Sequence, residues 1–171
     1  TAGVRWIYAP VLDLHRQGPE AVNSPIIANR AFSGDPERII ETAGAFAQGI
    51  LDAGGIPCGK HFPGHGACTQ DSHTEPGVSF EEPGDHLIPF KELLSKLPSI
   101  MVGHLEFPMV DESSRPASRS RTLMNILRKD WGYDGLVVTD ALRMEGYGSE
   151  PHEEMAVESL HAGVDLLLYP E

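Results

Sequence analysis

Cysteine is scarce in this sequence, with only Cys58 and Cys68 among 171 residues. That scarcity excludes the disulfide framework that stabilises many small secreted domains. A single bridge between the two cysteines is one alternative. Because a chain of this length can bury a sizeable core without a bridge, we expect two free thiols.

Long apolar runs and clusters of positive charge are also missing. No run of about 18 apolar residues occurs, so we expect no membrane span. Lys and Arg total 13 against 25 for Asp and Glu, which gives a net charge of −12. This balance argues against nucleic acid and anionic membrane surfaces as partners, because both bind clustered basic side chains. It suits a neutral partner such as a carbohydrate substrate.

Short apolar runs alternate with helical patterns along the chain. The runs predict five strands, at Trp6–Leu14, Ile56–Phe62, Ser99–Leu105, Leu136–Thr139 and Val164–Tyr169. The first helix begins at Asp35 and Pro36, which have the residue types of an N-cap and a first helical position. Further helices are expected at about 85–97, 120–132 and 153–162.

Strands that alternate with helices pair in parallel through right-handed crossovers. Two α/β architectures fit this pattern: a doubly wound open sheet and a (β/α)₈ barrel. The unusual polar residues follow the strand ends, where both architectures place their sites. Five strands are too few to close a barrel, so we expect either an open sheet or an incomplete barrel.

The densest chemistry lies in the loop Lys60–His73, which holds one amine, three imidazoles and one carboxylate. Lys60 and His61 end a predicted strand and offer hydrogen-bond partners to sugar hydroxyls. Asp71 and His73 are two residues apart, so the carboxylate can orient the imidazole as a general acid/base. The loop therefore predicts sugar binding combined with proton transfer.

Two alternatives exist for this loop. His61, His65, Asp71 and His73 include the ligand types of a zinc site, although the sequence has no HExxH helix. The second alternative is a polar loop with helix-capping residues. We regard that as the weaker reading, because Lys and His at a strand end followed by Asp-x-His are costly to arrange without a use.

Four further residues lie at or near the ends of predicted strands. Asp140 ends a buried strand, where a carboxylate is either a helix cap or a nucleophile. Together with an acid/base group it makes up the two parts that a retaining glycosidase needs. His104 ends another strand, as a residue that lines the site or as a core histidine. Met144 follows Asp140 and either lines the pocket or caps a helix, whereas Asp13 is expected to shape its own loop.

These residues resemble the β-N-acetylglucosaminidase branch of glycoside hydrolase family 3. The segment 60–73, of the form KHFPGHG…DSH, is the most specific match. The order and spacing of four other segments also agree, at Ala9–Leu14, Asn29–Pro36, Pro116–Ser118 and Val138–Gly146. The resemblance covers nearly the whole chain.

The resemblance implies a (β/α)₈ TIM-like barrel and retaining hydrolysis of terminal β-linked N-acetylglucosamine. By the same resemblance, Asp140 matches the nucleophile, His73 the acid/base and Asp71 its dyad partner. Arg30, Lys60 and His61 match residues that bind the sugar, and no metal or cofactor is expected. A relative that transfers the sugar to phosphate and an inactive sugar-binding protein are the alternatives.

The resemblance also predicts an incomplete domain over residues 1–171. In this family earlier βα units precede the strand at Trp6, and an early loop supplies a further sugar-binding Asp. We therefore expect about five βα units, without the early strands and the last one, and only part of the pocket. No signal-peptide pattern opens the sequence at Thr1, and a cytoplasmic and an exported location both agree with it, as does any oligomeric state.

Overall fold

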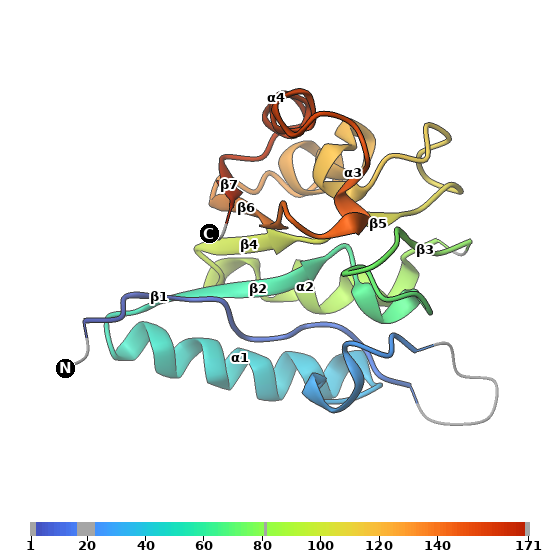
Figure 1. Ribbon diagram of the computed structural model, residues 1–171. Coiled ribbons are helices and arrows are strands. Elements are labelled where there is room, and N and C mark those ends of the chain that lie inside the picture. Colours follow the sequence, from blue (N-terminus) through green and yellow to red (C-terminus); the bar gives the residue numbers. More distant parts are fainter. Residues whose placement is uncertain (1–2, 17–22, 81, 170–171) are drawn as a thin grey trace.

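The computed structural model describes residues 3–16, 23–80 and 82–169 (Figure 1). Its main sheet has five strands, all paired in parallel in the order β1-β2-β4-β6-β7. These strands are β1 (Trp6–Ile7), β2 (Ile56–Phe62), β4 (Ser99–Val102), β6 (Leu136–Ala141) and β7 (Leu166–Leu168). Two short strands, β3 (Gly77–Val78) and β5 (Leu105–Glu106), form a separate parallel pair.

The spatial order of the described strands follows the order of the chain. A doubly wound sheet reverses its strand order at a switch point, and the described sheet has no such reversal. Its parallel strands with helices between them form an α/β half-barrel. The doubly wound alternative is therefore wrong for the described part of the chain.

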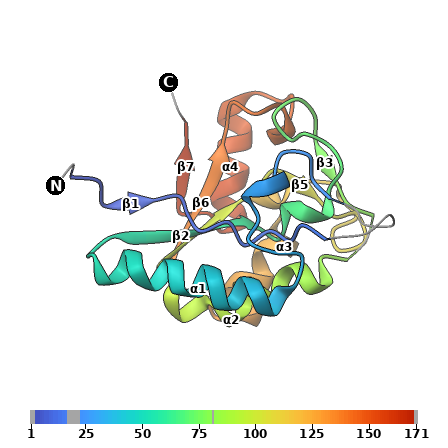
Figure 2. The same cartoon turned by 90° about the horizontal axis from the view of Figure 1, so that it is seen from below.

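Helix α1 (Pro36–Asp52) lies alongside β1 and β2 in both views (Figures 1 and 2). It begins as predicted, because the Asp35 carboxylate accepts a hydrogen bond of 3.0 Å from the amide of Glu37. Its buried face is lined by small and aliphatic residues that include Ile39, Ala43 and Ala47. This face covers the start of the sheet.

The expected helix at 85–97 is wrong as a continuous element. A 3₁₀ turn at Gly84–Leu87 leads into the short α2 (Ile88–Glu92), and a second 3₁₀ turn follows at Leu94–Lys96. Pro89 lacks the amide hydrogen that a continuous α-helix would need at its position. The break follows from this missing donor.

The last two helices agree better with expectation. The Ser120 hydroxyl accepts a 3.0 Å hydrogen bond from the amide of Leu123 and so begins α3 (Arg121–Asn125). A π-helical turn, Ile126–Asp130, extends α3. Helix α4 (His152–Ala162) ends at Gly163, whose φ of 123° favours glycine.

The strand predictions differ from the structure mainly at their ends. The first predicted strand shortens to Trp6–Ile7, since Pro10 has no amide hydrogen for a ladder. Val11 rejoins the sheet through a single parallel bridge to Lys60. Strand β4 ends at Val102. Strand β6 extends to Ala141, so Asp140 is the second-last residue of that strand.

The core fills the space between the sheet and its helices, with fully buried Phe62, Phe90 and Leu123 among its largest members. Ile56 and Leu136, which begin β2 and β6, are exposed. The other ends of these strands carry the polar residues Lys60, His61 and Asp140, at the edge where parallel α/β folds place their sites. Both cysteines are free thiols, as predicted. Within the described ranges no helix has the length and hydropathy for a bilayer crossing.

Candidate active site

Asp13 is the buried anchor of the site. Its side chain is fully buried, and Oδ2 accepts hydrogen bonds from both the amide and the ring Nδ1 of His61, at 3.1 and 2.7 Å. Oδ1 accepts a third bond, of 2.6 Å, from the amide of His65. Burial opposes ionisation, but His61 and the bonds from both histidines outweigh it and lower the pKa of Asp13. Asp13 therefore fixes His61 and the turn after it.

Asp140 lies next to this anchored histidine. Its Oδ2 is 3.8 Å from His61 Nε2, and its Oδ1 accepts a 2.8 Å bond from the amide of Ala141. The side chain is 18% exposed, which leaves a face open to a ligand. Burial raises its pKa, but His61, the Ala141 amide and Lys60 together produce a net lowering. Asp140 is thus held as a carboxylate that can act as a nucleophile.

Lys60 and His61 both come from the last part of β2. The peptide bond between them is cis, and the register of β2 against β4 shifts between Gly59 and Phe62. The carbonyl of Lys60 accepts a 2.6 Å bond from the amide of Leu12. Lys60 is half-buried, and its positive charge helps to lower the pKa of Asp140.

His104 is a buried residue that contacts the end of β6. It is fully buried, and its Nδ1 lies 2.8 Å from Ser118 Oγ and its Nε2 3.1 Å from the carbonyl of Ala141. Its ring packs 4.8 Å from that of Tyr147. Burial lowers the pKa of His104 to about 4, so the ring is neutral at pH 7. Since both nitrogens have partners, this geometry favours the core histidine over substrate binding.

Asp71 and His73 form the exposed pair that the sequence predicted. Asp71 Oδ1 accepts from both the amide and the ring Nδ1 of His73, at 3.0 and 2.7 Å. The two side chains are 42% and 58% exposed. The hydrogen bonds from the amide and the ring of His73 lower the pKa of Asp71. The exposed imidazole of His73 can therefore exchange protons beside an ionised carboxylate.

The segment that carries this pair lies against the chain just beyond Asp140. The amide of Glu145 donates to the carbonyl of His73 at 3.3 Å, and the amide of Gly146 donates to the carbonyl of Ser72 at 3.1 Å. A Cβ on Gly146 would lie 2.7 Å from that Ser72 oxygen. Only glycine permits this close approach, which brings the loop of His73 to the strand end of Asp140.

Arg30 and Met144 are the remaining residues that the sequence predicted for the site. Arg30 ends a 3₁₀ turn, Ala28–Arg30, and its exposed side chain donates through Nε to the carbonyl of Ile26 at 3.0 Å. Met144 is 8% exposed, and its amide donates to the carbonyl of Ala141 at 3.1 Å. Met144 is therefore held beside the end of β6, and Arg30 lies on a separate surface segment.

The four candidate zinc ligands do not come together. His65 uses its two ring nitrogens on Ser24 Oγ and Ser72 Oγ, at 3.0 and 2.7 Å. His61 binds Asp13 on the sheet, whereas His73 binds Asp71 on the loop. Within the described ranges, no group of three or more His, Cys, Asp or Glu side chains is placed to hold a metal ion.

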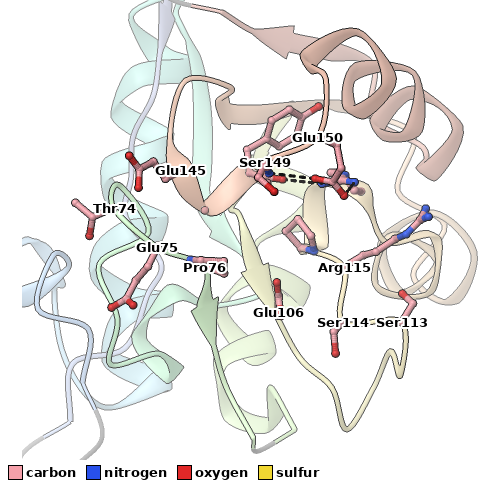
Figure 3. A pocket seen from close by; sticks show the side chains of 15 residues that line it. Thr74, Glu75, Pro76, Glu106, Ser113, Ser114, Arg115, Glu145, Ser149 and Glu150 are labelled. Carbon is pink, nitrogen blue, oxygen red and sulfur yellow. Dashed lines mark hydrogen bonds and ion pairs between the residues drawn. The ribbon is translucent and has the colours of Figure 1, made fainter.

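A hollow of about 690 Å³ opens beside the loop of His73 (Figure 3). Thr74 and Glu75 form one wall, and Arg115 and Glu150 lie across from them. Neither Asp140 nor His61 lines it. The hollow therefore adjoins the loop of His73 but does not contain the nucleophile candidate.

Along one wall of this hollow, the buried Arg119 pairs with two partly exposed glutamates and contacts the residue that packs on His104. Arg119 is 5% exposed and donates to Glu150 at 2.8 Å, to Glu158 at 2.7 Å and to the carbonyl of Tyr147 at 2.9 Å. Tyr147 in turn packs on His104. No local pattern in the sequence indicates this cluster, because Arg119 is 28 to 39 residues from its partners in the chain.

The comparisons with known proteins identify the family. The family model described as the glycosyl hydrolase family 3 N-terminal domain matches residues 1–171. The chain therefore belongs to that family, as its motifs predicted.

Two relatives named β-hexosaminidase are similar to the chain over most of its length. The chain is 41% identical over 169 residues to a β-hexosaminidase of Tolumonas auensis, covering 94% of this chain and 48% of that protein. It is 37% identical over 179 residues to the β-hexosaminidase LpqI of Mycobacterium tuberculosis, covering 98% and 45%. The chain thus spans about half the length of these curated relatives.

Solved structures have the same fold. The M. tuberculosis LpqI structure matches with a TM-score of 0.84 at 35% identity, over 98% of this chain and 50% of that one. A β-glucoside phosphorylase, BglX, matches with a TM-score of 0.88 at 33% identity, over 99% of this chain and 33% of that one. Similar backbones therefore belong to a protein named a β-hexosaminidase and to one named a β-glucoside phosphorylase.

Proposed function

We propose that residues 1–171 are part of the (β/α)₈ catalytic barrel of a retaining β-N-acetylglucosaminidase, with Asp140 as nucleophile. The observation that carries the proposal is the setting of Asp140: an ionised carboxylate with 18% exposure at the end of β6, beside the anchored His61. The two relatives named β-hexosaminidase support the sugar class. Lys60, His61 and Met144 are the proposed sugar-binding residues near Asp140, and Arg30 is proposed to contact the sugar from its separate surface segment.

In the first step, an Asp140 carboxylate oxygen attacks the anomeric carbon as the bond to the leaving oxygen breaks. The imidazolium of His73 gives its proton to that oxygen, and Asp71 stabilises the positive charge on the ring before transfer. The products are a glycosyl ester on Asp140, a neutral His73 and the released alcohol.

In the second step, water attacks the same carbon and loses a proton to the neutral His73. The ester bond to Asp140 breaks, and the carboxylate is restored. Because both steps invert the anomeric centre, the product keeps the β configuration. Histidine can serve both steps because its two protonation states are both accessible near neutral pH.

The phosphorylase relative makes phosphate the second acceptor to consider. In that reaction phosphate attacks the glycosyl ester in place of water, and the sugar leaves as a glycosyl phosphate. A neutral His73 does not repel an incoming anion as a second carboxylate would. The ring therefore fits transfer to phosphate as well as to water.

The test is turnover of p-nitrophenyl β-N-acetylglucosaminide by the purified protein, with NMR of the first anomer released. We expect β-N-acetylglucosamine as the first product. Release of the α-anomer would contradict a retaining mechanism. A rate that rises in proportion to phosphate, with a glycosyl phosphate as product, would assign the phosphorylase alternative.

A further inference from the structure

His65 contacts three parts of the site at once. It is 1% exposed in the 3₁₀ turn His65–Ala67. Its amide donates to Asp13, and its ring lies within hydrogen-bond distance of Ser24 and Ser72. Ser24 belongs to the segment that leads to Arg30, and Ser72 stands between Asp71 and His73. None of the sugar-binding or catalytic roles proposed above uses this imidazole.

The turn that holds His65 is packed too closely for other residues. Gly64 has a φ of 133°, and a Cβ there would lie 2.4 Å from the Cβ of His86. A Cβ on Gly66 would lie 2.1 Å from the carbonyl oxygen of Leu14. Glycine is required at both positions. The backbone on each side of His65 is thus fixed, and the ring is directed inward.

The ring can satisfy both serine contacts together. Burial lowers the pKa of His65 to about 4, so the ring is neutral at pH 7 and has one N–H donor and one acceptor nitrogen. A serine hydroxyl both donates and accepts. One of the two serines therefore accepts from the ring while the other donates to it.

We propose that His65 is a positioning residue for the acid/base step. Its ring holds Ser72, and through Ser72 the adjoining His73, in a fixed place relative to Asp13 and His61 on the sheet. The proposal rests on the proposed function, in which His73 gives a proton to the leaving oxygen. Small errors matter here, because a misplacement of about 1 Å can cost on the order of 100-fold in rate.

Leaving-group dependence tests the positioning. In Ser72→Ala, we expect kcat/KM to fall about 10-fold for a phenyl β-N-acetylglucosaminide, whose leaving oxygen needs a proton. For the 2,4-dinitrophenyl glycoside, which leaves without a proton, we expect a change below about two-fold. Since kcat/KM ends at formation of the glycosyl ester, the later base step does not enter. Equal losses with both substrates would overturn the proposal.

The matched control is Ser99→Ala, which removes a fully buried hydroxyl bonded to the Pro57 carbonyl at the start of β4. Its effect should be the same for both substrates. A second variant, His65→Phe, keeps a planar ring and removes both bonds. The double variant His65→Phe/Ser72→Ala tests whether His65 acts through Ser72. If it does, the loss of kcat/KM for the phenyl glycoside relative to the 2,4-dinitrophenyl glycoside should be no larger in the double variant than in His65→Phe alone. Additive losses would contradict this route.

Amide hydrogen exchange gives a readout without turnover. Ser72→Ala and His65→Phe should speed exchange at Glu75 and Gly146, whose amides bond to the carbonyls of Asp71 and Ser72. Ser99→Ala should leave both amides unchanged. If the wild-type protein turns over neither glycoside, the proposed function fails, and exchange still decides whether His65 holds the loop. Unchanged exchange in both variants would overturn that role.

Discussion

The same carboxylate–imidazole pair occurs twice in this molecule, in opposite surroundings. In both pairs the aspartate accepts from the amide and the Nδ1 of one histidine, and the ring bond is 2.7 Å. The side chains of Asp13 and His61 are 0% and 6% exposed, whereas those of Asp71 and His73 are 42% and 58% exposed. Identical bonds therefore serve different purposes.

The difference follows from where each pair lies. Asp13 and His61 are 48 residues apart, so their bond joins two distant segments and fixes His61 beside Asp140. Asp71 and His73 are two residues apart, so their bond orders only their own loop. Burial makes the first pair rigid and costly to break, and exposure leaves the second free to exchange protons.

The largest expected effect comes from breaking the buried pair. Asp13→Asn would turn an amide NH₂ toward N–H donors that now meet carboxylate oxygens. We expect the free energy of unfolding to fall by about 3–5 kcal/mol, as when one partner of a buried charged pair is removed. Urea unfolding at pH 7 measures it. A loss as small as that of an exposed pair would show that Asp13 is not the anchor.

Acid should weaken the buried region next. His65 and His104 stay neutral in the native protein down to about pH 4, whereas the unfolded chain protonates them near 6.5. The unfolded state then binds more protons, so this stability is complete above 6.5 and is lost as the pH falls toward 4. At pH 5 we expect a loss of about 2 kcal/mol for each ring.

The pKa values of Asp13 and Asp140 are lowered from 3.8, so their contributions are lost only below that pH and do not enter this window. Unfolding measured from pH 8 to pH 4 checks the slope. His104→Gln should reduce the slope of the free energy of unfolding against pH by up to the contribution of one bound proton. Substitution of the exposed His161 by Gln is the control. A stability that stays flat from pH 7 to pH 5 would contradict neutral buried rings.

The smallest expected effect on folding comes from the exposed pair. In Asp71→Asn, the amide oxygen can still accept both bonds from His73, so the midpoint of urea unfolding should match that of the wild type. Catalysis should suffer instead, because the negative charge beside the imidazolium is lost. We expect kcat/KM for the phenyl glycoside to fall about 10-fold. A destabilised protein with normal kcat/KM would show instead that the exposed pair serves folding and not catalysis.

The sequence predicted local features well. Residues 56–62 form β2 with the predicted bounds, and Asp35 caps α1 as its type indicates. The Asp71–His73 pair was also foreseen, since its partners are two residues apart. Each of these depends on a pattern within a few positions of the chain.

Such local patterns could not predict the long-range contacts. Asp13 was expected only to shape its own loop, yet its partners are 48 and 52 residues away. The clearest available signal was an acidic residue in an otherwise apolar run at a strand end. The bonds of His65 and His104 likewise depend on how the strands pack, so a local pattern could not separate a core histidine from one that binds substrate.

The central claim is that Asp140 is the nucleophile, and azide tests it most directly. In Asp140→Ala, turnover of the 2,4-dinitrophenyl β-glycoside should fall by several orders of magnitude and recover with sodium azide. Azide then enters from the face that the carboxylate has vacated, so the account predicts an α-glycosyl azide. A β-glycosyl azide, or unchanged turnover without azide, would contradict it.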